Sequence, residues 1–225
     1  SLKGESAHYL TRVLRLKNGQ NLILFDGSGA EWDSQIIHAT KHKVDVELLS
    51  KQSPKTESAL EITLLQSISR SQRMDFVMQK ATELGVKKII PVISQNTVVR
   101  LNESNLKNKM AHWKKIIISA AEQSGRVKLP AIIKPKPFSE ELLNEYKSPG
   151  SYFLDTTGDS GFSSKKISKT TIVVGPEGGF TVDEKQIAID TGYKVVKTGP
   201  RLLRTETAPI MAISILQYLY GDFSN

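Results

Sequence analysis

Short apolar runs separated by polar turns characterise the first fifty residues. Three of these runs are rich in β-branched, aromatic and leucine residues, and they lie at residues 21–25, 32–39 and 43–49. Runs of this kind, bounded by Gly, Asp, Thr and Lys, predict strands. Ahead of them, Leu10, Val13 and Leu14 fall at helical spacing. Short strands with tight turns and no long helix indicate a small β-barrel or sheet module over residues 1–57.

The pattern changes after residues 51–58, a polar segment that contains Pro54 and that we interpret as a linker. From there, strand-like apolar runs alternate with segments of helical period. The predicted strands are residues 60–68, 88–93, 152–154, 171–174 and 193–197. The predicted helices are residues 72–84 with Gly85 as C-cap, 106–123, 139–146, a helix opened by Thr181 and Glu184, and 209–219. This alternation predicts an α/β fold in which helices cover a parallel sheet.

Two glycine-centred turns stand out in the last fifty residues. The strand at 171–174 leads into Gly175-Pro176-Glu177-Gly178-Gly179. The strand at 193–197 leads into Gly199-Pro200-Arg201-Leu202-Leu203-Arg204-Thr205-Glu206-Thr207. Turns from strand to helix meet at the carboxyl edge of a parallel sheet, where ligands bind. We therefore expect the two turns to form two sides of one pocket.

Neither turn carries a familiar phosphate-binding or nucleophile motif. No Gly-Lys-Ser/Thr follows the first turn, it is not the Gly-x-Gly-x-x-Gly of a dinucleotide site, and no Ser sits in a nucleophile elbow. Gly178 and Gly179 would let a ligand approach the backbone closely. The sequence thus favours a main-chain pocket for an adenosine-like ligand, with Leu202 and Leu203 as walls. The alternative is that the glycines only permit tight turns.

Composition excludes several classes of chemistry. The chain has no Cys, and its four His do not cluster, which argues against a disulfide framework, a structural zinc site and a thiol nucleophile. These features fit a reducing cytoplasm. No apolar run approaches the roughly 18 residues of a membrane span, and no signal sequence is recognisable. Because the chain begins at Ser1, a preceding segment is expected to be missing.

The net charge of +8 is distributed unevenly. Residues 1–57 carry a surplus of one positive charge, and the remainder carries a surplus of seven. Between residues 100 and 136, nine Lys and Arg stand against Glu103 and Glu122. Clustered Lys and Arg suit a phosphate backbone, because their binding releases counterions. The alternative is a solvated, lysine-rich helix face.

The two turns also carry a specific resemblance. Gly175-Pro176-Glu177-Gly178-Gly179-Phe180-Thr181, taken with residues 199–208, resembles the paired signature of the ribosomal RNA small subunit methyltransferase E family, which belongs to the SPOUT superfamily of knotted methyltransferases. The similarity extends to residues 8–15, 70–75, 79–85 and 120–126. Several long motifs in the same order cover nearly the whole chain.

This resemblance implies a PUA-like RNA-binding β-barrel at residues 1–57 and a SPOUT domain at residues 58–225, with a C-terminal trefoil knot and a homodimer. Family members carry a longer segment before the His8 motif, including a first barrel strand, so part of the barrel is expected to be missing. The implied activity is methylation of N3 of a uridine in small-subunit (16S) ribosomal RNA, with S-adenosylmethionine as methyl donor and no metal. The donor would contact Leu154, Gly175, Glu177, Gly178, Gly179, Thr198, Gly199, Pro200, Leu202 and Leu203.

Methyl transfer to N3 requires an imide nitrogen that has lost its proton. A cation beside O2 or O4 of the uridine would stabilise the anion as it forms. Arg204 and Arg201, at the lip of the second turn, are the candidates. The alternatives are a surface salt bridge for Arg201, and a pair with Glu206 or with the partner subunit for Arg204.

The remaining polar residues of the turns allow more than one role. Glu177 would orient the methyl donor or stabilise its positive charge, which makes it a third catalytic candidate. Alternatively, Glu177 caps its turn or pairs with a neighbouring Arg. Thr205 or Thr207 is expected to be a helix N-cap rather than a catalytic hydroxyl.

The N3 atom lies on the Watson–Crick edge, so the target uridine must be unpaired or flipped. Recognition should therefore depend on RNA shape and splayed bases. The candidate RNA contacts are Arg12, Arg15, Arg70, Arg73, Arg100, Lys114, Lys115 and Arg126. Each of these side chains alone could be simply solvated.

Two other classes of function remain open from the residues. One is a binding module that holds RNA without catalysis and has no reason to bind S-adenosylmethionine. The other is an enzyme that uses a different adenosine-containing ligand, such as a nucleotide hydrolase. The lack of a P-loop and of clustered carboxylates for magnesium argues against the hydrolase.

Overall fold

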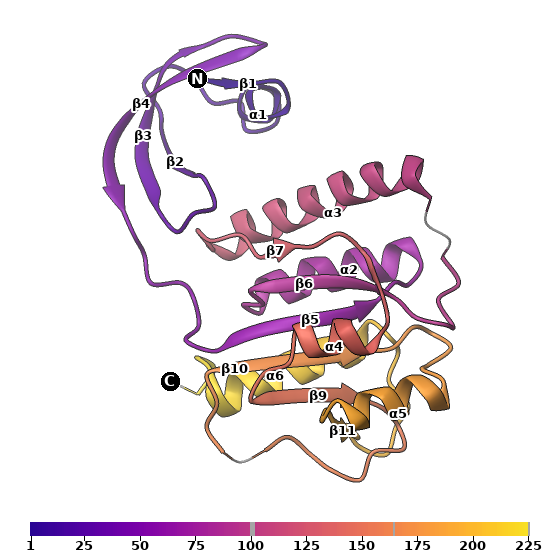
Figure 1. The fold of residues 1–225 in the computed structure, drawn as a ribbon. Coiled ribbons are helices and arrows are strands. Elements are labelled where there is room, and N and C mark those ends of the chain that lie inside the picture. Colours follow the sequence, from indigo (N-terminus) through magenta and orange to yellow (C-terminus); the bar gives the residue numbers. More distant parts are fainter. Residues whose placement is uncertain (100–101, 164, 225) are drawn as a thin grey trace. The chain divides into compact units, whose positions relative to one another are not determined.

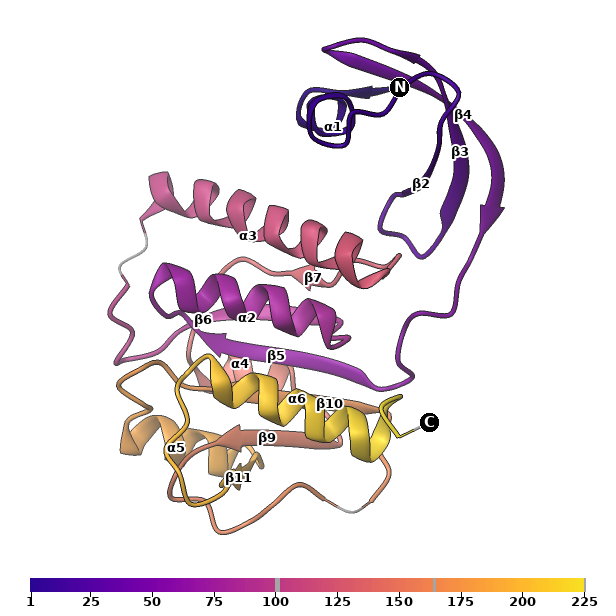
Figure 2. The same ribbon diagram turned by 180° about the vertical axis from the view of Figure 1, so that it is seen from behind.

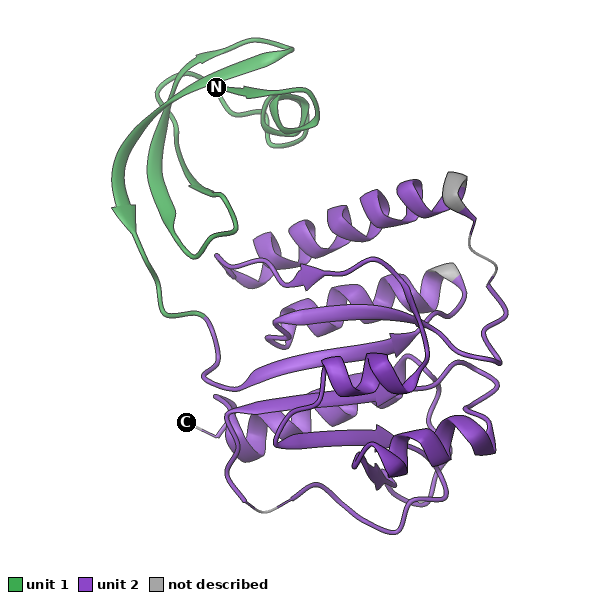
Figure 3. Ribbon diagram, viewed as in Figure 1, with its two compact units in different colours: residues 1–56 green, residues 57–225 purple. Residues whose placement is uncertain are grey.

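The computed structural model describes residues 1–99, 102–163 and 165–224. The chain forms two compact units, Ser1–Thr56 and Glu57–Asn225 (Figure 3). Arg100, one of the predicted RNA contacts, lies outside the described residues. In the described ranges, no helix combines the length and the apolarity needed to cross a membrane.

The first unit is built on a four-stranded antiparallel sheet in the order β1-β4-β3-β2. Its strands are β1 (Leu2–Lys3), β2 (Asn21–Phe25), β3 (Glu31–Ala39) and β4 (Lys43–Gln52). The helix α1 (Glu5–His8) continues into a π-helical turn, η1 (Tyr9–Val13). The three predicted strands are confirmed, although β4 extends into the segment interpreted as a linker.

The first helix of this unit buries one of the three apolar residues that fall at helical spacing. Leu10 packs in a small core with Ala7, Ile36 and Val44. Val13 and Leu14, which share its helical spacing, are 59% and 48% exposed. Because the helix ends in a π-turn, the periodicity expected of a regular α-helix does not place all three side chains in the core.

The second unit contains a parallel sheet in the order β11-β9-β10-β5-β6-β7, with β8 also paired to β6. The predicted α/β fold with a parallel sheet is therefore confirmed. The strands are β5 (Glu61–Ser67), β6 (Lys88–Ile93), β7 (Ala131–Ile132), β8 (Lys136–Pro137), β9 (Gly150–Leu154), β10 (Lys169–Val174) and β11 (Lys194–Val196).

Helices cover both faces of this sheet (Figures 1 and 2). The helices α2 (Ser71–Glu83), α3 (Glu103–Ser124) and α6 (Thr207–Tyr220) contribute side chains to one apolar core with Ile62, Leu64 and Ile172. The helices α4 (Glu140–Glu145) and α5 (Val182–Asp190) share the opposite core with Leu65 and Val173. Neighbouring residues of β5 and β10 thus alternate between the two cores, as the pleat of a strand requires.

Local sequence signals set the ends of several helices. Thr181 and Glu184 form the expected capping box at the start of α5, with Thr181 Oγ1 accepting from the Glu184 N–H at 3.2 Å. Gly85 follows the last residues of α2 with a φ of +83°, a left-handed conformation that favours glycine. The predicted capping box is confirmed, whereas the C-cap of α2 is Leu84, and Gly85 is the residue that follows it.

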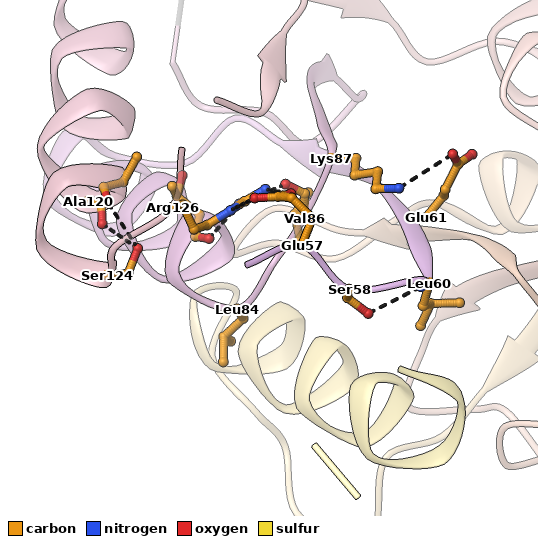
Figure 4. A network of polar contacts seen from close by, with 12 residues as sticks. Glu57, Ser58, Leu60, Glu61, Leu84, Val86, Lys87, Ala120, Ser124 and Arg126 are labelled. Carbon is orange, nitrogen blue, oxygen red and sulfur yellow. Dashed lines mark hydrogen bonds and ion pairs between the residues drawn. The ribbon is translucent and has the colours of Figure 1, made fainter. Parts of the chain in front are cut away.

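The structure overturns the expectation that Arg126 contacts RNA. Its side chain is only 4% exposed and is bound by Glu57, with Nε and Nη2 donating to the carboxylate at 3.0 and 2.6 Å (Figure 4). Its Nη1 donates to the carbonyls of Thr82 and Val86 at 2.6 and 3.1 Å. A desolvated guanidinium paired with a carboxylate is a structural anchor, here joining the beginning of the second unit to the end of α2.

Candidate functional site

Both glycine turns contribute to one pocket at the carboxyl ends of β9, β10 and β11. The pocket has a volume of about 660 Å³, which lies in the range of small-molecule sites. Its walls are formed by residues 154–157, 174–180, 197–199 and 201–205, together with Arg73 and Ala208. The expectation that the two turns form two sides of one pocket is confirmed.

Most of the residues predicted to hold a cofactor line this pocket. Nine of the ten do so, namely Leu154, Gly175, Glu177, Gly178, Gly179, Thr198, Gly199, Leu202 and Leu203. The exception is Pro200, which is exposed and is not part of the wall. Arg201 and Arg204, the two predicted catalytic cations, line the same pocket. The structure therefore brings together the groups that the sequence placed on separate turns.

The first turn is held firmly by its surroundings. The Gly179 N–H donates to the Pro176 carbonyl at 3.0 Å, and Gly179 has a φ of +69°. Asn96 Nδ2 donates to the carbonyls of Gly178 and Gly179 at 3.3 and 3.1 Å. A Cβ added to Gly178 would lie 3.2 Å from Cβ of Asn96. Glycine is thus needed in this turn both for a left-handed conformation and for a close approach.

Glu177 is paired with an arginine of α2. Its Oε1 accepts a hydrogen bond from Arg73 Nη1 at 2.8 Å and one from the Arg70 N–H at 3.3 Å. Partial burial alone would raise the pKa of Glu177, but its own backbone N–H, the Arg70 N–H and Arg73 outweigh that effect and lower the pKa below the ordinary 4.5. The predicted pairing with a neighbouring Arg is confirmed.

Arg73 also approaches the second turn. Its Nε lies 3.8 Å from Oε2 of Glu206, while its Nη1 binds Glu177. The side chain is 37% exposed and lines the pocket. The sequence suggested Arg73 as an RNA contact, but the structure gives it two carboxylate neighbours, one from each turn.

Arg204, in contrast, projects from the second turn into solvent. Its side chain is 78% exposed, and Nη1 lies 4.0 Å from Oε1 of Glu206. Leu202 is 83% exposed, and Arg201 is exposed as well. The predicted pair between Arg204 and Glu206 exists, but an exposed contact at this distance contributes little. Arg204 is therefore available to a ligand in the pocket.

The structure corrects the role expected for Thr205 and Thr207. The N-cap of α6 is Glu206, with no side-chain cap hydrogen bond. Thr205 is buried, and its Oγ1 donates to the carbonyl of Gly175 at 2.6 Å. Gln66 Nε2 donates to the same Oγ1 at 3.3 Å. Thr205 thus ties the second turn to the first, a long-range contact that a capping rule cannot reveal.

Two polar groups of the site were missed by sequence reasoning. Gln66 is fully buried at the end of β5, and a lone Gln in an apolar strand was the signal that could have found it. Asp155 follows β9 and lines the pocket. A carboxylate directly after a parallel strand is a comparable signal, since such positions face the ligand edge of the sheet.

The five remaining predicted RNA contacts within the described residues are all exposed. They are Arg12, Arg15 and Arg70, together with Lys114 and Lys115 on α3. Arg15 has a φ of +54°, which is uncommon for a residue other than glycine.

Among the residues that the structure describes, no group of three His, Cys, Asp or Glu side chains could hold a metal ion.

Comparisons with known proteins agree with this site. The RNA methyltransferase domain family matches residues 56–217, and the RNA methyltransferase PUA domain family matches residues 2–49. The chain is 34% identical to the ribosomal RNA small subunit methyltransferase E of Buchnera aphidicola subsp. Schizaphis graminum, over 100% of this chain and 92% of that protein.

Two solved structures resemble the chain over nearly its whole length. A Legionella pneumophila protein in complex with the cofactor SAM has a TM-score of 0.94 and 35% identity, covering 99% of this chain and 92% of the other. The ribosomal RNA small subunit methyltransferase E of Neisseria gonorrhoeae, bound to S-adenosylmethionine, has a TM-score of 0.89 and 37% identity, with coverage of 97% and 91%.

Proposed function

This chain belongs to the ribosomal RNA small subunit methyltransferase E family, and we propose that it methylates N3 of a specific uridine in 16S ribosomal RNA. It is an RNA methyltransferase that uses S-adenosylmethionine. The observation that carries the finer assignment is the single pocket lined by both turns, with the exposed Arg201 and Arg204 in its wall.

The pocket suits an adenosine-containing methyl donor. Gly178 and Gly179 leave the backbone of the first turn open to close approach, because both are exposed and lack side chains. Leu154, Leu202 and Leu203 supply apolar surface, and Gly175, Thr198 and Gly199 complete the walls. When bound, S-adenosylmethionine supplies an activated methyl group on a sulfonium centre. The protein's task is to hold that group and the uridine in line.

Arg204 is the group that we assign to the uridine. The N3 proton is weakly acidic, and loss of that proton places negative charge on O2 and O4. A guanidinium aimed at this charge stabilises the anion and is worth roughly 10² to 10³ in rate. Arg204 is 78% exposed and lacks a close carboxylate partner, so it can turn toward the base. Arg201, on the same turn, is the second cation available for this role.

Glu177 acts on the site mainly through position. Partial burial alone would raise the pKa of Glu177, but backbone hydrogen bonds and Arg73 outweigh that effect and lower the pKa, which favours the ionised carboxylate. Arg73 offsets much of its charge at 2.8 Å. We assign Glu177 to fixing the first turn beside the methyl donor, with a smaller contribution from its charge to holding the sulfonium cation.

The RNA is bound by cations outside the pocket in this proposal. Residues 1–57 act as the RNA-binding domain through Arg12 and Arg15, and residues 58–225 catalyse the reaction. Arg70, Lys114 and Lys115 on the second unit are exposed and contribute further phosphate contacts. The homodimer and the trefoil knot remain predictions from the resemblance, and the cytoplasmic location remains a prediction from the composition.

The decisive experiment is methyl transfer from labelled S-adenosylmethionine to small ribosomal subunits and to naked rRNA, both from a strain that lacks the gene. Nucleoside analysis should place the label in 3-methyluridine. Label in another nucleoside would overturn the N3 assignment while keeping the methyltransferase. No transfer to either acceptor, with no S-adenosylmethionine binding by calorimetry, would favour an RNA-binding module instead.

A further inference from the structure

Asp155 brings a carboxylate to the pocket at the end of β9. It directly follows the last residue of that strand, and its N–H donates to the Val196 carbonyl at 3.1 Å, next to β11. Its side chain is 19% exposed and forms part of the pocket wall. The family signature in the two turns does not include this residue.

The two oxygens of this carboxylate have different surroundings. Oδ1 accepts hydrogen bonds from the Thr157 N–H at 2.8 Å and from Thr157 Oγ1, and it lies 3.8 Å from Lys185 Nζ. Lys185 also donates to Thr157 Oγ1. Within the described part of the chain, Oδ2 receives no hydrogen bond. Oδ1 therefore fixes the side chain, and Oδ2 is left to accept from a ligand.

The loop that carries Asp155 is held close against β11. A Cβ on Gly158 would lie 2.7 Å from the Lys197 nitrogen and 2.8 Å from the carbonyl carbon of Val196, which leaves room only for glycine. Ser160 forms a parallel bridge with Val196, and its carbonyl accepts from the Lys197 N–H at 3.2 Å. The carboxylate is therefore preorganised before a ligand arrives.

Asp155 is the carboxylate of the pocket wall with the more distant charge partner: Lys185 Nζ lies 3.8 Å from Asp155 Oδ1, whereas Arg73 Nη1 lies 2.8 Å from Glu177 Oε1. In the described residues, Asp155 and Glu177 are the two carboxylates that line the pocket. Oε1 of Glu177 is already bound by Arg73 and the Arg70 N–H. A nucleoside in this pocket presents two ribose hydroxyls. Besides main chain and apolar side chains, the rest of the wall holds Lys and Arg side chains, which cannot accept a hydrogen bond, and Thr hydroxyls, which are weaker acceptors than a carboxylate. Oδ2 of Asp155 is the matching acceptor.

We propose that Asp155 binds the ribose hydroxyls of S-adenosylmethionine through Oδ2. This rests on the proposed function only for the identity of the ligand. Hydroxyl donors form short, charge-assisted hydrogen bonds with a carboxylate. The ribose is favoured over the ammonium of the methionine portion because Lys185 already balances the charge of Asp155, and a second cation would be repelled. Asp155 is thus a specificity-determining residue for a ribonucleoside.

The substitution Asp155→Asn isolates Oδ2. An asparagine can keep Oδ1 as acceptor for Thr157 while it replaces Oδ2 with an NH₂ donor, so the loop should stay folded. Calorimetry would measure binding of S-adenosylmethionine and of 5′-methylthioadenosine, which has the ribose but lacks the amino-acid part. We expect both ligands to weaken by a similar factor, about 10-fold to 100-fold. Asp159→Asn, in the same loop but outside the pocket wall, should leave both affinities unchanged.

A ligand modification tests the same contact without relying on the variant alone. Wild-type protein should bind the 2′-deoxy analogue of 5′-methylthioadenosine at least several-fold more weakly than the parent compound, and Asp155→Asn should remove most of that difference. An equal penalty in both proteins would overturn the proposal.

Two further outcomes would overturn the assignment in distinguishable ways. A loss confined to S-adenosylmethionine, with 5′-methylthioadenosine unaffected, would place the carboxylate on the ammonium group. Failure of the wild-type protein to bind either ligand would overturn the proposed function together with this inference. Normal binding by wild type and by Asp155→Asn would overturn the inference alone.

Discussion

The two turns of the pocket both begin with Gly-Pro but differ in how they are held. In the first turn, the carbonyls of Gly178 and Gly179 accept hydrogen bonds from the Asn96 side chain, and Glu177 is bound by Arg73. The second turn exposes Leu202 at 83% and Arg204 at 78%, with one distant carboxylate beside Arg204. One side of the pocket is therefore built before a ligand binds, and the other is open to solvent.

This difference matches the two tasks of the proposed reaction. A small cofactor that is bound in every turnover gains affinity from a preorganised wall. A base that must leave its RNA stack needs a side of the pocket that is open to solvent. The exposed side chain of Arg204 can turn toward such a base. We infer that the first turn serves binding and that the second serves the reacting base, so substitutions in the two turns should separate affinity from rate.

Arg204→Ala should produce the largest effect and should test the second turn. We expect the single-turnover rate to fall by about 10² to 10³ because the uridine anion loses its stabilising cation. S-adenosylmethionine affinity, measured by calorimetry, should change little. Part of the lost rate should return at high pH, where more of the uridine is already deprotonated.

Arg201→Ala provides the comparison for that variant. A rate loss equal to that of Arg204→Ala would mean that the two cations share the role. Normal turnover by Arg204→Ala would remove Arg204 from the mechanism, and loss of cofactor binding would place it in the pocket architecture.

Thr205→Val should affect the tie between the turns. The change keeps the shape of the side chain but leaves the Gly175 carbonyl and the Gln66 amide without their shared partner, at a cost of about 1 to 3 kcal/mol. The melting temperature should fall by several degrees, and cofactor affinity should fall with it. Thermal unfolding with and without S-adenosylmethionine would measure both.

Thr207→Val is the matched control. Thr207 is exposed at the beginning of α6, so the same chemical change there should be close to neutral. Equal destabilisation by the two variants would show that the contact between Thr205 and Gly175 carries no special weight.

Arg73→Met should test the pairing that holds the first turn. The Arg73 side chain is 37% exposed, so solvent screening limits the loss to roughly 1 kcal/mol or less. We expect S-adenosylmethionine affinity to fall a few-fold, while RNA binding in the absence of cofactor stays near normal. If RNA binding falls instead, Arg73 contacts RNA, as its sequence position suggested.

The pH dependence of the same pair should give the smallest effect. Partial burial alone would raise the pKa of Glu177, but the backbone hydrogen bonds and Arg73 lower that pKa below 4.5. A lowered pKa in the folded state means that the stabilisation is present at neutral pH and is lost as the pH falls below about 4.5 through that pKa. The difference in stability between wild type and Glu177→Gln should therefore shrink in this range, by a few tenths of a kcal/mol after screening. A constant difference down to pH 3 would contradict the pairing.

Much of the second unit could be predicted because its signals are local. The strand at Lys88–Ile93 and the capping box of Thr181 and Glu184 follow from residues within a few positions of one another. The carboxyl-edge rule then predicts that the two turns meet. The same rule also points to Asp155, but its spare oxygen depends on the fold of residues 155–160, for which the sequence offers no simple pattern.

Arginine roles show where local reasoning ends. Arg73, Arg126 and Arg204 are equally basic in sequence, and each was a candidate for RNA or catalysis. In the structure, the Arg126 side chain is 4% exposed and paired with Glu57, and the Arg73 side chain is 37% exposed and paired with Glu177. The Arg204 side chain is 78% exposed. Burial, rather than residue type, therefore separates the structural role of Arg126 from the pairing of Arg73 with Glu177 and from the solvent-exposed Arg204.

The sequence by itself determined the alternation of strands and helices, the positions of the two turns and the need for glycine in them, because these depend on backbone preferences over a few residues. Only the tertiary structure decided the partners of the charged groups. Glu57 and Arg126 are 69 positions apart, and Arg73 and Glu177 are 104 apart. Long charged side chains have no local pattern that selects a distant partner, so the packed sheet and helices must first bring the two ends together.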